Sequence, residues 1–288
     1  MALIELTDVS KLYGFGDATT LALDEVSLSV ERGEFVAVMG PSGSGKTTLM
    51  NVIGLLDRPT NGNYLLDGRH ADRLRPNRRA KLRRDRIGFV FQNYNLLPRL
   101  NVLENVALPL AYKGMTPVRR ARRASDMLER VGLREREYFF PRHLSGGQAQ
   151  RAAIARALIN NPNIIIADEP TGNLDSTDSK VVMELLSDIH RQGNTILLVT
   201  HNPELTRYAN RVIYMYDGML VGDEFTAIGQ MASGARRVYY EKHELTDEDI
   251  VSGVSKLLSD VPGKELAPMP RRKTKRRKRA PRRGKAIN

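Results

Sequence analysis

The sequence contains no cysteine. This absence excludes disulfide bonds and thiolate metal sites, and it is compatible with a reducing compartment. No segment approaches the roughly 18 consecutive apolar residues that a membrane-spanning helix requires. The first residues also lack the basic, apolar and small-residue pattern of an export signal. We therefore expect a cytoplasmic protein, and its 41% of hydrophobic residues are enough to bury a sizeable core.

Acidic and aromatic residues are both absent from the C-terminal end. Residues 271–288 contain 11 lysines or arginines, which is most of the formal net charge of +12. About one positive charge is left for the rest of the chain. The basic character is therefore a property of this tail, and it is no argument for nucleic-acid binding by the folded body.

The apolar pattern predicts an α/β fold with a parallel sheet, an antiparallel N-terminal portion and a helical insert. Alternating segments in residues 3–30 indicate antiparallel strands, and the apolar runs 35–39, 163–167 and 195–200 are typical of buried parallel strands. An amphipathic stripe between the last two runs predicts a helix that ends before Gly193, so that strand, helix and strand form a right-handed crossover. The apolar residues of this stripe are Val181, Val182, Leu185, Leu186 and Ile189.

Two further helices are predicted before this crossover. Apolar residues recur at helical spacing after a glycine-rich loop, at Leu49, Val52, Ile53 and Leu56. Thr116 followed by Pro117 is a helix start signal. We interpret the arginines of that second helix as a solvated face rather than a binding patch. They are Arg119, Arg120, Arg122 and Arg123.

The sequence pattern divides the chain into a main domain, residues 1–225, and a C-terminal extension. Within the main domain we expect a helical subdomain in about residues 93–160. The extension, residues 226–262, contains one predicted amphipathic helix over residues 246–259. Residues 263–288 are rich in proline and basic residues, so we expect them to be disordered.

The loop after residue 39 matches the G-x-x-x-x-G-K-[ST] pattern of a phosphate loop, and it lies between a predicted strand and a predicted helix. Glycines let successive backbone N–H groups turn toward phosphate oxygens, and the helix N-terminus adds its dipole. Lys46 is expected to contact the β- and γ-phosphates, and the Thr47 hydroxyl is expected to hold Mg²⁺. The residues predicted to bind nucleotide here are Gly40, Ser42, Gly43, Ser44, Gly45, Lys46, Thr47 and Thr48.

Two carboxylates follow the apolar run that ends at residue 167. The carboxyl end of a buried strand is where α/β sheets bind ligands. Asp168 suits the magnesium shell, directly or through water, and Glu169 suits the base that polarises an attacking water. An acidic pair after a strand is also common as a helix cap or turn, and the phosphate loop upstream is what favours the catalytic interpretation.

A third motif, Leu144-Ser145-Gly146-Gly147-Gln148, precedes a predicted helix. Ser145 and the two glycines would stand at the N-terminus of that helix with donors available for an anion. A plain helix cap would explain the serine but not the paired glycines. With Arg151 following, the segment resembles the signature sequence of ATP-binding cassette (ABC) proteins, and the resemblance covers about residues 2–225.

The resemblance implies a function and a P-loop NTPase fold. Besides a mixed sheet, this fold has an antiparallel N-terminal β subdomain and an α-helical signature subdomain. In that family one ATP is bound between the phosphate loop of one subunit and the signature sequence of the other. A second copy of the chain is therefore an expected partner, with Ser145 and Gly147 contacting the γ-phosphate in trans from the signature segment. That segment also contains Gly146 and Gln148.

Other positions match residues with roles in the family. Tyr13 falls where the family has an aromatic that stacks on adenine. Gln92, after the predicted strand 87–91, matches the glutamine that senses magnesium and couples to the membrane partner. Asp175 matches the loop that links the two sites of the dimer. His201 matches the histidine that contacts the γ-phosphate, although a lone histidine after a strand is more often structural.

Finer similarity points to one branch of the family. Residues 49–62, 104–110 and 168–175 are similar to the ATPases of lipoprotein-releasing and macrolide-export systems. The resemblance implies that the chain powers an integral membrane permease from the inner face of the membrane. Such subunits usually end near residues 225–240, and nothing in the resemblance explains why this chain continues.

Two other functions stay open at this point. A cell-division-type ABC ATPase that regulates a cell-wall hydrolase through a membrane partner would have the same catalytic subunit. An ABC ATPase acting on ribosomes or nucleic acid is disfavoured, because such members typically carry two cassettes and because the basic tail offers no aromatic residue for base stacking. The tail could instead contact anionic lipids, with solubility or adhesion to RNA as alternatives.

Overall fold

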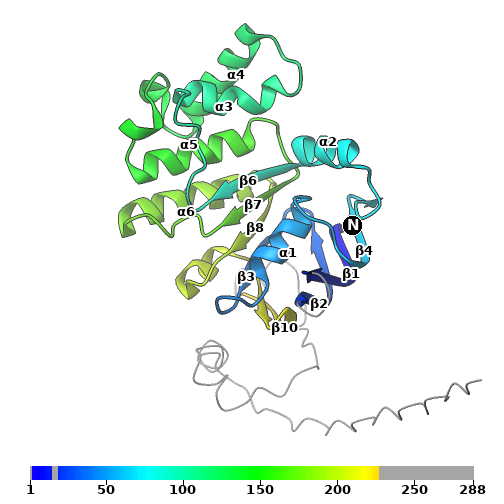
Figure 1. The fold of residues 1–288 in the computed structure, drawn as a ribbon. Helices are drawn as coiled ribbons and strands as arrows, with labels where there is room; N and C mark the ends of the chain where they lie inside the picture. Colours follow the sequence, from blue (N-terminus) through cyan, green and yellow to red (C-terminus); the bar gives the residue numbers. More distant parts are fainter. Residues whose placement is uncertain (1, 15–18, 227–288) are drawn as a thin grey trace, which may run out of the picture. The chain divides into compact units, whose positions relative to one another are not determined.

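A computed structural model describes residues 2–14 and 19–226 of the chain (Figure 1). Every described residue belongs to one compact unit, which falls within residues 1–243. The predicted helix over residues 246–259 and the basic tail, residues 263–288, lie outside the described residues. Within the described ranges, no helix is both long and apolar enough to cross a membrane.

In the described part of the chain, the larger sheet has six strands in the order β10-β9-β3-β8-β7-β6. All neighbouring pairs are parallel except β9 and β10, so the sheet is mixed as predicted. The apolar runs that predicted β3, β7 and β8 are buried almost throughout. The strands are β3 (Phe35–Met39), β6 (Ile87–Phe91), β7 (Ile164–Asp168), β8 (Thr195–Val199), β9 (Arg211–Tyr216) and β10 (Met219–Phe225).

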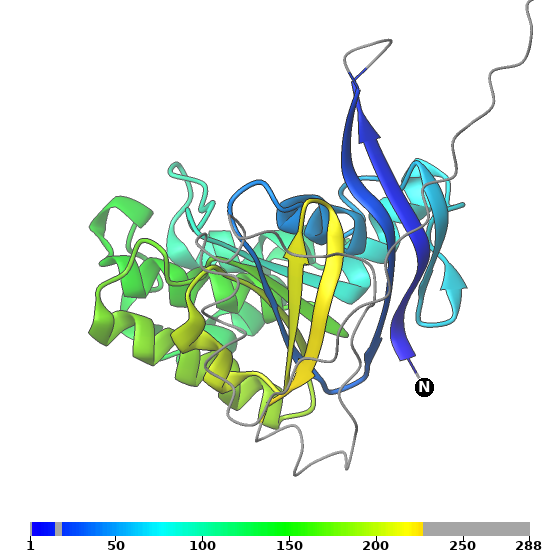
Figure 2. The same ribbon diagram turned by 90° about the horizontal axis from the view of Figure 1, so that it is seen from below.

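The second sheet is antiparallel, and among the described residues it has four strands in the order β2-β1-β4-β5. Its strands are β1 (Ala2–Tyr13), β2 (Thr20–Glu31), β4 (Asn61–Leu66) and β5 (Arg69–His70). Figure 2 shows β1 and β2 side by side over their length. Alternate residues of β2, Val26, Leu28 and Val30, are buried, which confirms the predicted one-sided burial of this segment.

Helix α1 (Lys46–Ile53) lies between the two sheets, with contacts to β2 on one side and to β7 and β8 on the other. Its apolar face joins the main hydrophobic core. The predicted stripe was wrong at its end, because Leu56 lies beyond the helix and is exposed. The helix ends at Ile53, whose carbonyl accepts a hydrogen bond from the buried Tyr64 hydroxyl at 2.6 Å, and Gly54 follows as the C-cap.

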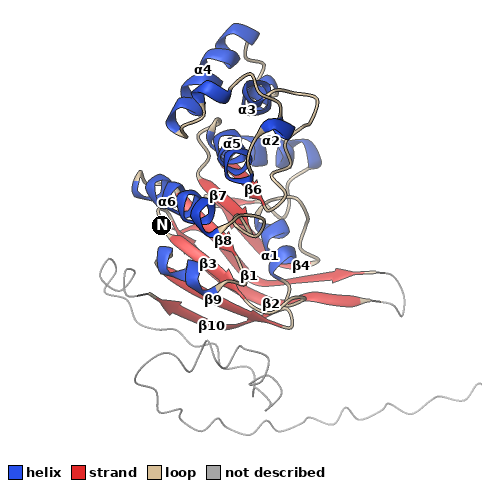
Figure 3. Cartoon of the chain, turned by 90° about the vertical axis from the view of Figure 1, so that its left-hand side faces the viewer, coloured by secondary structure: helices blue, strands red, loops and turns tan. Residues whose placement is uncertain are grey.

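Three helices lie together at one end of the unit (Figure 3), and they contact one another. They are α3 (Val102–Ala111), α4 (Pro117–Arg130) and α5 (Gly146–Leu158), with the short 3₁₀ turns η1 (Arg134–Arg136) and η2 (Pro141–His143) between the last two. Helix α4 starts at Pro117, as predicted, and buries Ala124, Met127 and Leu128. Arg119, Arg122 and Arg123 are exposed, as a solvated face requires.

The remaining helices lie along the larger sheet. Helix α6 (Ser176–Arg191) contacts β8 and is the crossover helix predicted between β7 and β8. Gly193, two residues after it, has a φ of 96°, which suits the predicted stop. Helix α2 (Pro76–Arg86) leads into β6, and the turn η3 (Pro203–Tyr208) leads into β9.

Candidate active site

Four neighbouring parallel strands end at the same edge of the larger sheet, and each end carries a predicted site segment. Strand β3 leads into the phosphate loop, β8 into His201, β7 into Glu169 and β6 into Gln92. Because β3, β8, β7 and β6 are adjacent, segments that are far apart in the sequence come together here.

The phosphate loop is shaped by glycines whose positions admit no side chain. Gly40 has a φ of 155°, and a Cβ there would lie 2.2 Å from the carbonyl oxygen of Met215. Gly45, with a φ of 96°, is the N-cap of α1 and gives the helix no side-chain cap. The first amide groups of α1 therefore stay available to an anion in the loop. Ser42 and Gly43 are exposed and Ser44 is buried.

Lys46 lies across this loop. Its Nζ donates hydrogen bonds to the carbonyl oxygens of Gly40 at 2.8 Å and Pro41 at 2.6 Å. Partial burial lowers the pKa of Lys46, and the nearby charges of Glu169 and Asp168 oppose that shift. Burial likewise raises the pKa of Asp168, with Glu169 adding to the shift and Lys46 opposing it. Lys46, Asp168 and Glu169 therefore share one electrostatic environment.

Glu169 is fixed by its neighbours at the end of β8. One carboxylate oxygen, Oε1, accepts a hydrogen bond from the backbone amide of His201 at 2.9 Å and lies 2.6 Å from Nδ1 of the same residue. The other oxygen, Oε2, accepts from the Thr200 hydroxyl at 3.1 Å. The backbone of Glu169 has a φ of 44°, an uncommon conformation for a residue with a side chain. Its amide donates to Val199, which ties the two strand ends together.

Tyr13, the predicted adenine-stacking residue, lies at the end of β1 and is 39% exposed. Its hydroxyl donates to Asp57 Oδ2 at 2.9 Å, and the Lys11 ammonium lies 4.8 Å from the ring centre. Burial raises the pKa of Tyr13, the interaction with Asp57 adds to this, and a side-chain hydrogen bond with Thr48 opposes it. Tyr13 is thus held beside the first turns of α1, which begin at the phosphate loop.

Gln92 faces the loop that precedes α6. Its Nε2 donates to Asn173 Oδ1 at 3.2 Å, and Asn173 Nδ2 donates back to the Gln92 carbonyl at 3.2 Å. A Cβ on Gly172 would lie 2.7 Å from Gln92 Nε2, so the two segments are in close contact. Asp175, at the end of this loop, is the N-cap of α6 and accepts from the Asp178 amide at 2.8 Å.

The signature segment forms the start of α5. Ser145 is the N-cap, and its Oγ accepts from the Gln148 amide at 3.2 Å while Gln148 Oε1 accepts from the Ser145 amide at 3.1 Å. This reciprocal pair is a capping box. Gly147, one of the paired glycines, is buried and donates its amide to Asp178 Oδ2 at 3.0 Å. The segment therefore joins the first turn of α5 to the first turn of α6.

Comparison with known proteins decides the family. A sequence model of ABC transporters matches residues 23–172. The chain is 48% identical over 222 residues to the ABC transporter ATP-binding protein YvrO of Bacillus subtilis, which covers 77% of this chain and 97% of that protein. The chain belongs to the ABC transporter family. Within this ABC family it is also 50% identical over 221 residues to the macrolide export ATP-binding/permease protein MacB of Hyphomonas neptunium, across 77% of this chain and 34% of that protein. The chain thus matches about a third of the length of such fused relatives.

A solved ABC structure has the same fold. It is the ATP-binding cassette MJ0796, a dimer in a post-hydrolysis state with ADP and phosphate bound. The TM-score is 0.72 at 44% sequence identity, over 77% of this chain and 98% of that chain. The predicted fold, a P-loop NTPase core with a mixed sheet, an antiparallel sheet and helices, is confirmed, and the chain is an ATP-binding ABC ATPase.

The structure of this ABC ATPase also shows contacts that the sequence did not predict. Thr200 is the last residue of the apolar run 195–200, and its hydroxyl donates a hydrogen bond to Glu169. Asn173 lies in the segment 168–175 without a role in the sequence analysis, and its side-chain oxygen accepts a hydrogen bond from Gln92. Asp57 lies in the segment 49–62 and Asp178 lies outside the motifs, and neither has a role in the sequence analysis, yet they accept hydrogen bonds from Tyr13 and Gly147. The sequence shows an acidic residue, Asp178, in the first turn of α6, but nothing in the sequence indicates that it bonds Gly147.

Proposed function

We propose that the chain is the ATP-hydrolysing subunit of a transporter and that it works as a pair around two ATP molecules. The observation that carries this proposal is the arrangement of Lys46, Asp168, Glu169 and His201 at the carboxyl ends of β3, β7 and β8. A phosphoryl group seated over the phosphate loop would meet one cation, two carboxylates and an imidazole. Such a set supports phosphoryl transfer by positioning and by charge stabilisation.

Each side chain has a proposed role that follows from its contacts. Lys46 neutralises phosphate charge from within the loop, where two carbonyl oxygens orient it. Glu169 orients the attacking water, and its two oxygens are already fixed by Thr200 and His201. Since the Glu169 carboxylate accepts at Nδ1 of His201, the opposite ring nitrogen is left to face the γ-phosphate. Tyr13 stacks on the adenine ring.

We propose Mg²⁺ as the cofactor, held by Thr47, Asp168 and Gln92. Among the described residues, no three or more His, Asp or Glu side chains are grouped to hold a metal by themselves. Magnesium is commonly bound by one or two protein oxygens together with substrate phosphates and water, so this donor set fits it. Burial, with the Glu169 charge adding to it, raises the pKa of Asp168, and a cation beside Asp168 would offset this by favouring the charged carboxylate. When bound, the ion would neutralise charge on the β- and γ-phosphates.

The proposed partners are a second copy and a membrane permease. MJ0796 is a dimer, and pairing of this chain would bring Ser145 and Gly147 of one copy to the γ-phosphate of the other. MacB joins an ATP-binding part and a permease in one protein, and this chain matches only a third of it. We therefore propose a permease of the macrolide-export or lipoprotein-releasing type as the membrane partner, and we propose that Gln92 couples to it.

The test is the variant Glu169→Gln, which keeps the shape of the side chain but removes the base. We expect this variant to bind ATP, to hydrolyse it at least about a hundredfold more slowly, and to accumulate as a dimer. Sedimentation velocity with and without ATP measures the dimer, and phosphate release measures turnover. Lys46→Ala is the control that should neither turn over ATP nor dimerise. A monomeric Glu169→Gln protein at saturating ATP would contradict the pairing.

A further inference from the structure

The donor that is proposed to bind the partner's phosphate is already occupied within the same chain. The Gly147 amide donates to Asp178 Oδ2 at 3.0 Å. A Cβ on Gly147 would lie 2.2 to 2.4 Å from three atoms of that carboxyl group, so the carboxyl group lies directly against the glycine. Asp178 is held there by α6, because its own amide is bonded to the Asp175 side chain at 2.8 Å.

This placement is electrostatically favourable in the single chain. The first turn of a helix carries amide groups without helical partners and the positive end of the helix dipole, so a carboxylate stabilises it. Asp178 therefore fills the anion position at the start of α5 with a charge that belongs to α6. The same negative charge adds to the burial that raises the pKa of Tyr94, which lies two residues after Gln92.

An incoming phosphate would compete for this position. The carboxylate and the phosphate carry charges of the same sign, so placing both about 3 Å from one amide nitrogen brings two negative charges into close repulsion. The γ-phosphate of the opposite copy can therefore reach Gly147 only after Asp178 has moved away. The Ser145 hydroxyl, by contrast, accepts a bond from Gln148 and keeps its hydrogen available to donate.

We propose that Asp178 is an internal gate on the signature segment, which opposes closure of the ATP-bound pair until the γ-phosphate displaces it. This inference rests on the proposed function, in which Gly147 meets nucleotide in trans. Breaking the hydrogen bond between Asp178 and Gly147 makes the free energy of closure less favourable. The bond forms again when the two copies separate, which favours the open state. Binding of the γ-phosphate at the signature segment would therefore move Asp178, and with it the loop before α6.

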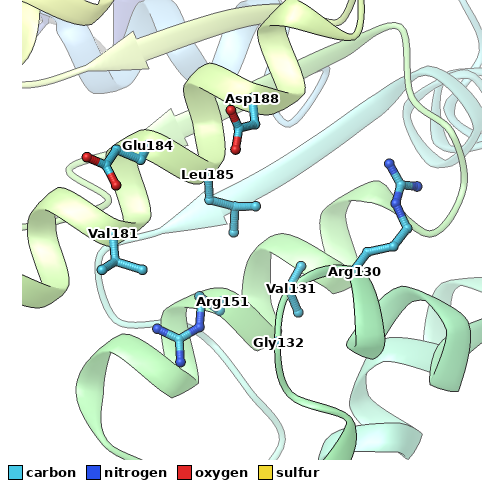
Figure 4. Close-up of a pocket in the computed structure, with 8 residues that line it drawn as sticks. All are labelled: Arg130, Val131, Gly132, Arg151, Val181, Glu184, Leu185 and Asp188. Atoms are coloured by element: carbon cyan, nitrogen blue, oxygen red, sulfur yellow. The ribbon is translucent and has the colours of Figure 1, made fainter.

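The packing between the two helices leaves room for such a movement. A cavity of about 440 Å³ lies further along the α5–α6 seam (Figure 4). Val181 and Leu185 line it from α6, Arg151 lines it from α5, and Gly132 lines it from the segment after α4. The cavity begins at Val181, about one turn of α6 after Asp178, so a shift of this part of α6 meets open space on that side.

The experiment compares charge and contact at position 178 in the slow Glu169→Gln protein. Asp178→Asn keeps an oxygen for Gly147 and removes the charge, whereas Asp178→Ala removes both. Glu184→Gln is the matched control, because it removes one negative charge from an exposed position of the same helix. The ATP concentration that gives half-maximal dimer is measured by sedimentation velocity, and binding to the monomer is measured with a fluorescent ATP analogue.

We expect both Asp178 variants to lower the half-maximal ATP concentration by about fivefold or more, in the range usual for coupled sites. Glu184→Gln should leave it unchanged, and all variants should bind the analogue equally as monomers. If the Asp178→Asn protein dimerises at the same or a higher ATP concentration, the gate proposal is wrong. Asp178 would then have only a structural role, joining α6 to α5. If the Glu169→Gln parent does not dimerise at all, the proposed function fails, and the gate fails with it.

Discussion

The Thr200 hydroxyl offers a direct way to test the positioning of Glu169. Thr200 is fully buried, and its hydroxyl donates to Glu169 Oε2 at 3.1 Å and accepts from the Asn202 amide at 3.1 Å. Thr200→Val replaces this hydroxyl by a methyl group of similar size. The change frees one of the two carboxylate oxygens, while the other stays bound to His201.

The expected effect follows from the strength of that hydrogen bond. A hydrogen bond to a charged group contributes about 1.5–3 kcal/mol, and each 1.36 kcal/mol in the barrier changes a rate about tenfold. If the bond orients the carboxylate in the transition state, kcat falls by about 10- to 150-fold. The KM for ATP should change little, because the proposed phosphate contacts are with the loop around Lys46. Steady-state phosphate release at a series of ATP concentrations separates the two parameters.

Thr195→Val provides the matched control. Thr195 lies at the opposite end of β8, is equally buried, and accepts a hydrogen bond from the Gly33 amide at 2.9 Å. Its replacement should lower the melting temperature, because a part-buried amide loses its acceptor, but it should leave kcat unchanged. A Thr200→Val enzyme that keeps kcat within twofold of the wild type would refute the positioning of Glu169 by this hydroxyl.

Three further predictions concern the framework of the site. In Gly40→Ala the new Cβ would lie 2.2 Å from the Met215 carbonyl oxygen, so the loop must shift; we expect lost binding in a fluorescent-nucleotide titration and a lower melting temperature. Asp223→Ala removes the carboxylate that Arg211 contacts at 2.6 and 2.5 Å. Urea unfolding should show that the free energy of unfolding falls by about 3 kcal/mol. An unchanged unfolding midpoint would contradict this prediction. Burial raises the pKa of Glu34, so its carboxylate costs stability above that pKa and the cost disappears as the pH falls through it. Glu34→Gln should therefore melt above the wild type at about pH 8 and level with it near pH 4, and a constant difference would be inconsistent with this account.

The strands were predictable wherever burial is continuous along them. The run over residues 35–39 coincides with β3, and the run over residues 195–200 extends one residue past β8. The end of α1 was not predictable, because the Ile53 carbonyl is bonded by the Tyr64 hydroxyl from β4 and the backbone turns left-handed at Leu55, with a φ of 57°. Leu56 continues the apolar spacing in the sequence, but the chain has already left the helix at Gly54.

The candidate site shows the same limit. The phosphate loop and the acidic pair are local patterns, so their residues were predicted from the sequence, although their roles stay proposals. The contacts of Glu169 with Thr200 and of Gly147 with Asp178 join positions 31 residues apart. Such contacts depend on the order of the strands and on local backbone angles, such as the φ of 44° at Glu169, and residue spacing does not encode them.

The two carbonyl bonds of Lys46 have a consequence for how tightly nucleotide binds. A free lysine side chain samples many rotamers, and fixing one on binding typically costs about 0.5–1.5 kcal/mol. In this chain the Lys46 ammonium is already held by the carbonyl oxygens of Gly40 and Pro41. Its side chain therefore loses rotamer freedom when the protein folds, before any ligand binds. The loop is in this sense preorganised, so less side-chain entropy remains to be lost at Lys46 when a phosphate binds.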